Sequence, residues 1–228
     1  MLVCTLHAVT VQYQIRATRW VRNLVFATVS LLAVSGCALV SVWGDSQVAR
    51  GVPQVEAQFQ NVATVDLHGR YGCGLFVNAF CGAPDWPTAV DAALASYTAN
   101  GQQPNCFVVH LGLNDALWRL DLVTKNYAAK LDAFLKLFPT QTKVIWINLP
   151  FASNPKLPGL DDRLLFINAQ LVVAQARFSN LVVIDLRQHF NGHFPQWYDP
   201  DGFHYNPVGL QELAATMRAA TAAAGCTS

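Results

Sequence analysis

The chain has 228 residues, of which 53% are hydrophobic and only 13% are charged, and its formal net charge is +1. An average globular domain has about 25% charged residues, and a nucleic-acid-binding domain carries a basic patch. The composition therefore favours an apolar globular domain of ordinary size and argues against a nucleic-acid partner.

The first 37 residues have the features of an export signal. Three arginines, Arg16, Arg19 and Arg22, precede the apolar run 24–34, which small residues and Cys37 follow. A positive region, a short apolar region and a small-residue site are typical of secretory signal peptides. The sequence therefore predicts an exported protein, either secreted or attached to the outer face of the cell membrane.

Two alternatives remain for this segment. Val-Ser-Gly-Cys at 34–37 resembles the lipobox of bacterial lipoproteins, but the predicted first strand begins directly after Cys37 and leaves almost no tether for a lipid. Retention as a membrane anchor is the other alternative. We predict a signal peptide or membrane anchor over residues 1–37 and one domain over residues 38–228.

Short apolar runs alternate with amphipathic segments along this domain. Nearly continuous apolar runs are expected for strands that helices cover on both faces, and they predict strands over 38–43, 62–67, 107–111, 144–149 and 181–185. The segments between them predict helices over 47–58, 86–98, 123–138, 161–178 and 207–223. This alternation indicates an α/β fold with a parallel sheet between two helical layers.

Two long connections, 148–159 and 188–206, follow predicted strands. In folds of this class, binding loops lie at the carboxyl edge of the sheet. We therefore expect a functional site at that edge.

Four cysteines lie within the domain, and an even number in an exported protein indicates disulfides. Right-handed crossovers place all strand starts at one edge of the sheet. Cys106 lies at a strand start, and Cys226 ends a helix that must descend to the same edge, whereas Cys73 and Cys81 share a loop at the opposite edge. Of the three pairings, topology favours Cys73–Cys81 and Cys106–Cys226.

Three polar motifs lie at the ends of predicted strands or helices. Gly44-Asp45-Ser46 comes after the first strand and before a helix, where backbone N–H groups can stabilise negative charge beside the serine. Asn114 follows the third strand and can donate its amide at the same edge. Asp201 lies three residues before His204, a spacing that lets the carboxylate orient the imidazole. Each motif alone is also compatible with an ordinary turn or helix cap.

Taken together and in this order, the motifs resemble the SGNH hydrolase family, also called GDSL-like lipases and esterases. That family has G-D-S after the first strand, a glycine after the second, G-x-N-D after the third and D-x-x-H before the last helix. The matching segments are Gly44-Asp45-Ser46, the glycine-rich run 69–74, Gly112-Leu113-Asn114-Asp115 and Asp201-Gly202-Phe203-His204. The resemblance covers about residues 38–224.

The resemblance implies a role for each matched residue. Ser46 is the nucleophile, His204 its general base, and Asp201 the carboxylate that orients His204. The backbone N–H groups of Ser46 and Gly72 and the amide of Asn114 form the oxyanion hole. The run 69–74 contains more than one glycine, so the motif alone does not identify which one donates its N–H group. Spacing favours Gly72, with Gly74 second. No cofactor is expected.

The fold implied is a three-layer α/β/α sandwich with a five-stranded parallel sheet in flavodoxin-like order 2-1-3-4-5. The function implied is a serine esterase that acts on a small-molecule, lipid or carbohydrate ester through an acyl-enzyme. Three alternatives stay open. They are an O-acyltransferase acting on cell-envelope carbohydrate, a non-catalytic envelope-binding module, and a cytoplasmic esterase with reduced cysteines.

Several other residues are weighed against these roles. His189 and His193 are four residues apart, but Asn191-Gly192 between them argues against a shared helix face, and we predict no metal site. His110 lies within a strand and is expected in the core. Asp199 is an alternative to Asp201 as the carboxylate that orients His204, but its separation from His204 fits this role less well. Aromatic residues of the two long connections could line a substrate cleft or simply anchor the loops; they are Phe151, Trp197, Tyr198 and Phe203.

Overall fold

The computed structural model describes residues 7–12, 28–33, 38–75, 81, 85–118, 120–150 and 157–227. Contacts divide the chain into two units, residues 1–37 and residues 38–228. In the first unit, β1 (His7–Gln12) and β2 (Thr28–Ala33) form an antiparallel pair. None of the helices in the described ranges has both the length and the hydrophobicity that a membrane crossing requires.

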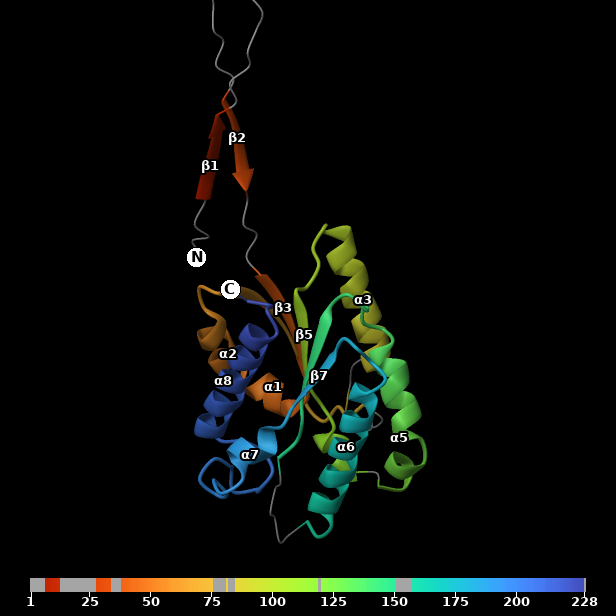
Figure 1. The fold of residues 1–228 in the computed structure, drawn as a ribbon. Coiled ribbons are helices and arrows are strands. Elements are labelled where there is room, and N and C mark those ends of the chain that lie inside the picture. The colour runs from red at the N-terminus through yellow and green to blue at the C-terminus, as the bar shows by residue number, and fades with distance from the viewer. Residues whose placement is uncertain are drawn as a thin grey trace, which may run out of the picture. The chain divides into compact units, whose positions relative to one another are not determined.

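The second unit is built on a five-stranded parallel sheet (Figure 1). Its strands are β3 (Ala38–Gly44), β4 (Ala63–Gly69), β5 (Cys106–His110), β6 (Lys143–Ile147) and β7 (Leu181–Ile184). They lie in the order β4-β3-β5-β6-β7, so the predicted order 2-1-3-4-5 is confirmed. Because every neighbouring pair is parallel, all five carboxyl ends lie at one edge of the sheet.

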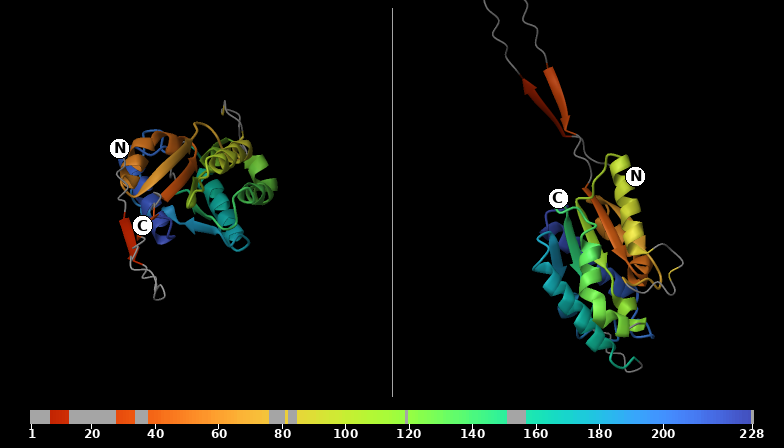
Figure 2. Two further views of the ribbon diagram at one scale, coloured as in Figure 1. Left: turned by 90° about the horizontal axis from the view of Figure 1, so that it is seen from above. Right: turned by 90° about the vertical axis from the view of Figure 1, so that its right-hand side faces the viewer.

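Helices cover both faces of this sheet (Figures 1 and 2). One layer consists of α2 (Val52–Phe59) and α8 (Pro207–Ala223). The other consists of α3 (Trp86–Ala99), α5 (Leu120–Leu135) and α6 (Leu160–Gln175). Three short helices follow strand ends: α1 (Ser46–Arg50), α4 (Leu113–Trp118) and α7 (Leu186–Phe190).

The sheet separates two hydrophobic clusters. In β5, Phe107 and Val109 face one cluster and Cys106 and Val108 face the other, and all four are fully buried. Successive side chains of a strand point to opposite faces, so a strand covered on both faces needs apolar residues at every position. This requirement explains the nearly continuous apolar runs in the sequence.

The helices differ from the sequence prediction in number and in bounds, and α5 and α6 each end three residues before the predicted ends at 138 and 178. The helix expected over 47–58 is divided, because the backbone N–H of Gly51 closes α1 on Gln47 and Val48 and Pro53 begins a new first turn. The helices α4 and α7 were not expected, since five or six residues are too few to show a helical period. The last helix has the predicted bounds, 207–223.

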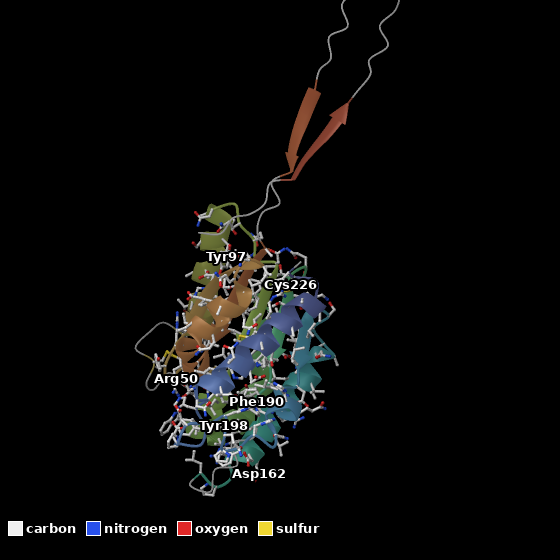
Figure 3. All side chains as sticks on the ribbon, turned by 90° about the vertical axis from the view of Figure 1, so that its left-hand side faces the viewer. Arg50, Tyr97, Asp162, Phe190, Tyr198 and Cys226 are labelled. Carbon is white, nitrogen blue, oxygen red and sulfur yellow. A yellow bond between two sulfur atoms is a disulfide. The ribbon has the colours of Figure 1, made fainter. Side chains whose placement is uncertain are left out.

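Two disulfides link Cys73 with Cys81 and Cys106 with Cys226, with Cα–Cα distances of 5.0 and 5.8 Å. This is the pairing that the sheet topology predicts. Figure 3 shows Cys226 near the same end of the domain as Tyr97, with Arg50, Phe190 and Tyr198 toward the other end. The second disulfide therefore ties the end of α8 to the amino edge of the sheet, away from the carboxyl edge.

A chain of hydrogen bonds connects α3 to β3 and β4. The hydroxyl of Tyr97 donates to Asp66 Oδ2 at 2.5 Å and lies 2.8 Å from the buried Ser41 Oγ. Ser41 Oγ in turn accepts from Trp43 Nε1 at 2.7 Å, and His68 Nε2 lies 3.0 Å from Asp66. Hydrogen bonds from His68 and then from Tyr97 hold the pKa of Asp66 below its ordinary value.

We expect Tyr97→Phe to lower the free energy of unfolding by about 2 kcal/mol, because it leaves Ser41 and Asp66 without a hydroxyl partner. Urea denaturation followed by circular dichroism measures the change. Tyr71→Phe is the matched control, since Tyr71 is 63% exposed and should alter stability by less than about 0.5 kcal/mol. Equal effects of the two substitutions would contradict a stabilising role for the Tyr97 hydroxyl.

Candidate active site

Ser46 and His204 meet at the carboxyl edge of the sheet. Ser46 is the first residue of α1, directly after β3, and His204 lies in the segment 191–206 that joins α7 to α8. Ser46 Oγ is 2.8 Å from His204 Nε2. Ser46 is 4% exposed, so its hydroxyl is largely shielded from water while it remains in contact with the imidazole.

Asp201 holds the other side of the His204 ring. Its Oδ2 lies 2.7 Å from His204 Nδ1, and its Oδ1 accepts the backbone N–H groups of Phe203 and His204 at 3.1 and 3.0 Å. Burial alone would raise the pKa of Asp201, but these hydrogen bonds hold it below its ordinary value. An ionised Asp201 accepts a hydrogen bond from Nδ1–H of His204, which leaves Nε2 free of a proton as the acceptor for the Ser46 hydroxyl.

Asp199 does not contact the His204 imidazole in this arrangement. Its carboxylate forms an ion pair with Arg50 of α1. Its backbone N–H donates to the carbonyl oxygen of His204 at 2.8 Å. Asp199 therefore supports the backbone of the segment, whereas Asp201 contacts the ring.

Asn114 lies in the first turn of α4 and contacts Asp45, the residue before Ser46. Its Nδ2 is 3.4 Å from both Asp45 Oδ2 and the carbonyl oxygen of Cys73. These distances are at the long limit for hydrogen bonds. Two long hydrogen bonds thus orient the amide, whose N–H groups remain able to donate to an acceptor that lies closer.

The loop after β4 supplies the glycines named by the sequence. Gly72 has φ +68°, a left-handed conformation that favours glycine, and it is partly exposed. Gly74 is buried, and a Cβ there would lie 2.5 Å from Asp115 Oδ1. Close packing therefore explains the glycine at Gly74, and only Gly72 combines a turn conformation with partial access to solvent.

Asp115 anchors this loop to α4. It is fully buried, and its Oδ2 accepts the backbone N–H of Leu75 at 2.8 Å. The contact joins the end of the 70–75 loop to the residue after Asn114. The two candidate oxyanion donors, Gly72 and Asn114, therefore belong to segments that are held together directly.

Asp45 is a second fully buried carboxyl at the site. Its Oδ1 accepts the backbone N–H of Gln47 at 3.0 Å and so caps α1. Burial raises the pKa of Asp45 to about 7, and the nearby Asp115 adds to this effect, although the hydrogen bonds from Gln47 and Asn114 oppose it. Asp45 is therefore close to its protonation midpoint at neutral pH.

Three other histidines, His110, His189 and His193, have their polar or ring partners outside the Ser46–His204–Asp201 group. His110 is fully buried, its Nδ1 is 3.0 Å from the carbonyl oxygen of Ile147, and burial lowers its pKa to about 4. His189 bonds Glu212 at 2.8 Å, and His193 stacks on Trp197 at 3.7 Å. Within the described part of the chain, no group of three or more His, Cys, Asp and Glu side chains is arranged to hold a metal ion.

The aromatic residues of the last connection fall into two groups. Trp197 and Tyr198 pack around Phe190, with ring centroids 5.1 and 6.3 Å away, and so anchor the loop. Phe203 lies beside the catalytic candidate His204, with ring centroids 4.5 Å apart. Phe151 lies outside the described residues. Of the described three, Phe203 alone contacts a candidate site residue through its ring.

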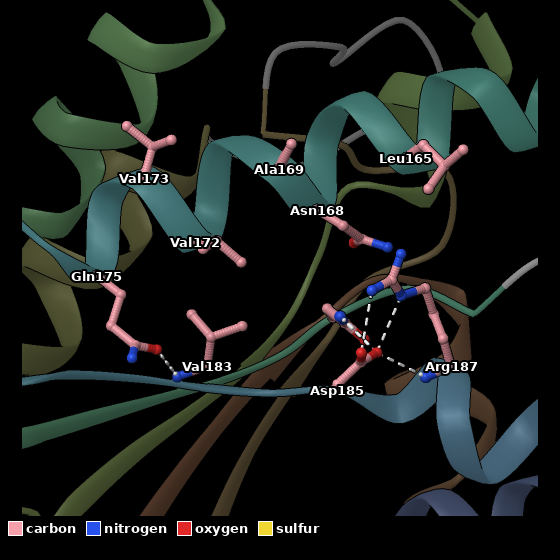
Figure 4. Close-up of a pocket in the computed structure, with 10 residues that line it drawn as sticks. Leu165, Asn168, Ala169, Val172, Val173, Gln175, Val183, Asp185 and Arg187 are labelled. Carbon is pink, nitrogen blue, oxygen red and sulfur yellow. Dashed lines mark hydrogen bonds and ion pairs between the residues drawn. The ribbon is translucent and has the colours of Figure 1, made fainter.

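A pocket of about 560 Å³ lies between α6 and β7, the edge strand farthest from β4 (Figure 4). Its lining includes a bidentate ion pair between Arg187 and Asp185. It also includes Gln175, whose Oε1 accepts the backbone N–H of Val183 at 2.7 Å. Its lining contains neither Ser46 nor His204. The pocket is therefore separate from the candidate active site.

Comparisons with known proteins agree with this architecture. Residues 42–212 match the model of the GDSL-like lipase/acylhydrolase family. The chain therefore belongs to this family. A search of curated proteins gave no significant match.

Solved structures of the same fold resemble the chain at low sequence identity. A lipase/acylhydrolase from Enterococcus faecalis is 19% identical, with a TM-score of 0.66, over 84% of this chain and 97% of the other. A carbohydrate acetylesterase from Sinorhizobium meliloti is 14% identical, with a TM-score of 0.62, over 82% and 99%. The catalytic domain of peptidoglycan O-acetyltransferase A from Streptococcus pneumoniae is 15% identical, with a TM-score of 0.59, over 85% and 97%.

The raised pKa of Asp45 predicts a specific pH dependence of stability. A carboxyl group whose pKa is higher in the folded protein than in the unfolded chain stabilises the fold below about pH 4, and this contribution disappears as the pH rises to about 7. The free energy of unfolding of the native protein should therefore fall relative to that of Asp45→Asn over this range, by up to a few kcal/mol.

Urea denaturation of both proteins between about pH 4 and pH 8 measures this difference. Asp91→Asn, at an exposed position of α3, is the control for a surface carboxyl. A difference between native protein and Asp45→Asn that stays constant with pH would show that the Asp45 pKa is not raised.

Proposed function

We propose that the protein is a serine esterase that forms an acyl-enzyme on Ser46. The observation that carries this proposal is the continuous chain from Ser46 Oγ to His204 Nε2 at 2.8 Å and from His204 Nδ1 to Asp201 Oδ2 at 2.7 Å. A hydroxyl, an imidazole and a carboxylate linked in this order are the arrangement that activates a serine nucleophile.

In the first half-reaction, Ser46 Oγ bonds to the carbonyl carbon of the ester while its proton passes to His204 Nε2. The carbonyl π electrons move to oxygen and give a tetrahedral oxyanion. Collapse of this intermediate breaks the bond to the alcohol oxygen, which takes the proton from Nε2 as it leaves. Asp201 stabilises the imidazolium that exists between these two steps.

The backbone N–H groups of Ser46 and Gly72 and the side-chain amide of Asn114 would hold the oxyanion. An oxyanion is a stronger acceptor than the two neutral or partly protonated oxygens that Asn114 meets at 3.4 Å. Removal of one such donor typically lowers kcat by about 10²–10³-fold. We expect Asn114→Ala to fall in this range.

In the second half-reaction, an acceptor hydroxyl attacks the acyl-Ser46 ester. His204 removes the acceptor proton and returns it to Ser46 Oγ as the ester bond breaks. Water as acceptor gives hydrolysis, and a sugar hydroxyl gives acyl transfer. The same residues serve both reactions, so acceptor choice depends on what binds beside Ser46.

A fluorophosphonate probe tests the nucleophile directly. The native protein should be labelled on Ser46, and Ser46→Ala should remain unlabelled and lose at least about 10³-fold in kcat for p-nitrophenyl acetate. Ser96→Ala, at an exposed serine of α3, is the control and should be labelled normally. A folded Ser46→Ala protein with native turnover would end the proposal, and an unlabelled native protein would favour a non-catalytic binding module.

A carbohydrate ester is the substrate class that we favour. Among the described residues, the exposed large aromatic side chains are Tyr71 and Trp118, which are 63% and 52% exposed. Tyr71 precedes Gly72, and Trp118 lies one helical turn beyond Asn114 on the same face of α4. The flat faces of sugar rings stack on aromatic rings, and two structural neighbours are a carbohydrate acetylesterase and a peptidoglycan O-acetyltransferase domain.

Trp118→Ala should separate sugar binding from ester chemistry. We expect kcat/KM for acetylated xylo-oligosaccharides to fall about tenfold, equivalent to about 1.4 kcal/mol of transition-state binding, with less than a twofold change for p-nitrophenyl acetate. Val172→Ala, an exposed apolar position on α6, should change neither value. Equal losses on both substrates would contradict a sugar-binding role for Trp118.

We also propose that the domain acts outside the cytoplasm. The two disulfides support this location, because such bonds persist in oxidising compartments. The segment 1–37 would then serve as a signal peptide or membrane anchor, with Cys37 as the residue modified if the segment is a lipobox.

A further inference from the structure

Gln47, the residue after the candidate nucleophile, spans the segment that carries His204. Its Nε2 donates to the carbonyl oxygen of Phe203 at 2.8 Å, and its Oε1 accepts the backbone N–H of Tyr205 at 3.1 Å. The side chain is fully buried. One amide group thus bonds to the backbone on both sides of His204.

This amide can hold the segment in only one register. A flip of the side chain would place Oε1 against the carbonyl oxygen of Phe203 and Nε2 against the N–H of Tyr205, so neither hydrogen bond could form. The opposite end of Gln47 is fixed as well, because its backbone N–H donates to Asp45. Since the contacts are buried, loss of either one leaves an unsatisfied backbone group, which is costly.

Arg50 provides a second contact from the same face of α1, three residues later. It forms an ion pair with Asp199, whose backbone N–H donates to the carbonyl oxygen of His204. The Arg50 and Asp199 side chains are 28% and 27% exposed. A partly exposed ion pair contributes less than a buried hydrogen-bond pair and is weakened by salt.

The segment that these contacts hold has little regular structure of its own. Residues 191–206 lie between α7 and α8 and contain one isolated bridge, between Tyr198 and Tyr205. The local bonds from Asp201 fix the His204 ring relative to its own turn, but they do not connect that turn to α1. Gln47 and Arg50 make that connection.

We propose that Gln47 is a positioning residue that sets the distance between Ser46 and His204, and that Arg50 gives weaker support to the same segment. This inference rests on the proposed function of Ser46 and His204. The nucleophile and both contacts belong to one five-residue helix. A shift of the His204 segment relative to Ser46 would therefore distort the Gln47 hydrogen bonds.

Gln47→Leu removes both hydrogen bonds at nearly constant volume. We expect kcat for p-nitrophenyl acetate to fall on the order of 10²-fold with KM within about threefold, since small misplacements of reacting groups have effects of this size. The rate constant for fluorophosphonate labelling of Ser46 should fall in parallel. Gln54→Leu on α2 is the matched control, because the buried Oε1 of Gln54 has no hydrogen-bond partner among the described residues, and it should stay within twofold.

Gln47→Glu gives a readout that loss of stability alone would not produce. A protonated carboxyl can donate to Phe203 and accept from Tyr205, as the amide does, whereas a carboxylate would oppose the Phe203 carbonyl oxygen. The ratio of kcat for Gln47→Glu to native kcat should therefore decrease as the pH rises from about 6 to 9. The same ratio for Gln47→Leu should not change with pH. Active-site titration at each pH corrects for unfolded protein.

Arg50→Met tests the weaker contact. We expect less than about a fivefold loss of kcat, and the difference from the native protein should shrink in about 0.5 M salt.

Two results would overturn the proposal: a folded Gln47→Leu protein with kcat and labelling within threefold of native, or a Gln47→Glu ratio independent of pH. If Gln47→Leu does not fold, the test depends on Gln47→Glu: a ratio that falls with pH supports the proposal, and a constant ratio overturns it. Failure of the proposed function is seen separately, as undiminished turnover by Ser46→Ala.

Discussion

The hydrogen bond between Ser46 and His204 depends on where the strands of the parallel sheet end. The two residues are 158 positions apart, and neither lies in a strand. Ser46 is placed by β3, whose carboxyl end passes directly into α1, and Asn114 by β5, the neighbour of β3. Because these strands are parallel, their ends converge without any long-range contact specific to the site. His204 does not follow a strand directly, and hydrogen bonds from Gln47 connect its segment to α1.

Burial of polar groups is the cost of this arrangement, and the site offsets it by pairing them. Asp45, Gln47, Asn114 and Asp115 are each no more than 5% exposed. Each of them makes at least one hydrogen bond to the backbone or to another member of the group. An unpaired member would cost more than the net value of its hydrogen bond. The carboxyl edge is therefore stable only as a connected network, which also restricts how far its side chains can move.

The sequence allowed the sheet, its strand order and the motif residues to be predicted, because these depend on local signals. Apolar runs such as Phe107–Val109 indicate strands that are buried on both faces. Ser46, Asn114 and His204 each belong to a motif next to a strand or helix end. Gln47 gave no such signal. A glutamine inside a predicted helix is read as facing solvent, and its burial depends on Phe203 and Tyr205, more than 150 residues away. Long-range pairing of polar side chains is what a single sequence does not reveal.

Two carboxyls of the candidate site, Asp201 and Asp45, have opposite environments. Three N–H groups donate to Asp201 and keep its pKa low, whereas burial raises that of Asp45 to about 7. A charged Asp201 suits the proposed mechanism, because its carboxylate faces the imidazole that would become positive. A full charge on Asp45 would be harmful, because its Oδ2 lies 3.4 Å from the Asn114 amide and would compete with an oxyanion for that donor. By raising the Asp45 pKa, burial lowers the average negative charge where the reaction itself develops one. The same fold thus favours the charged form of Asp201 through hydrogen bonds and the neutral form of Asp45 through burial.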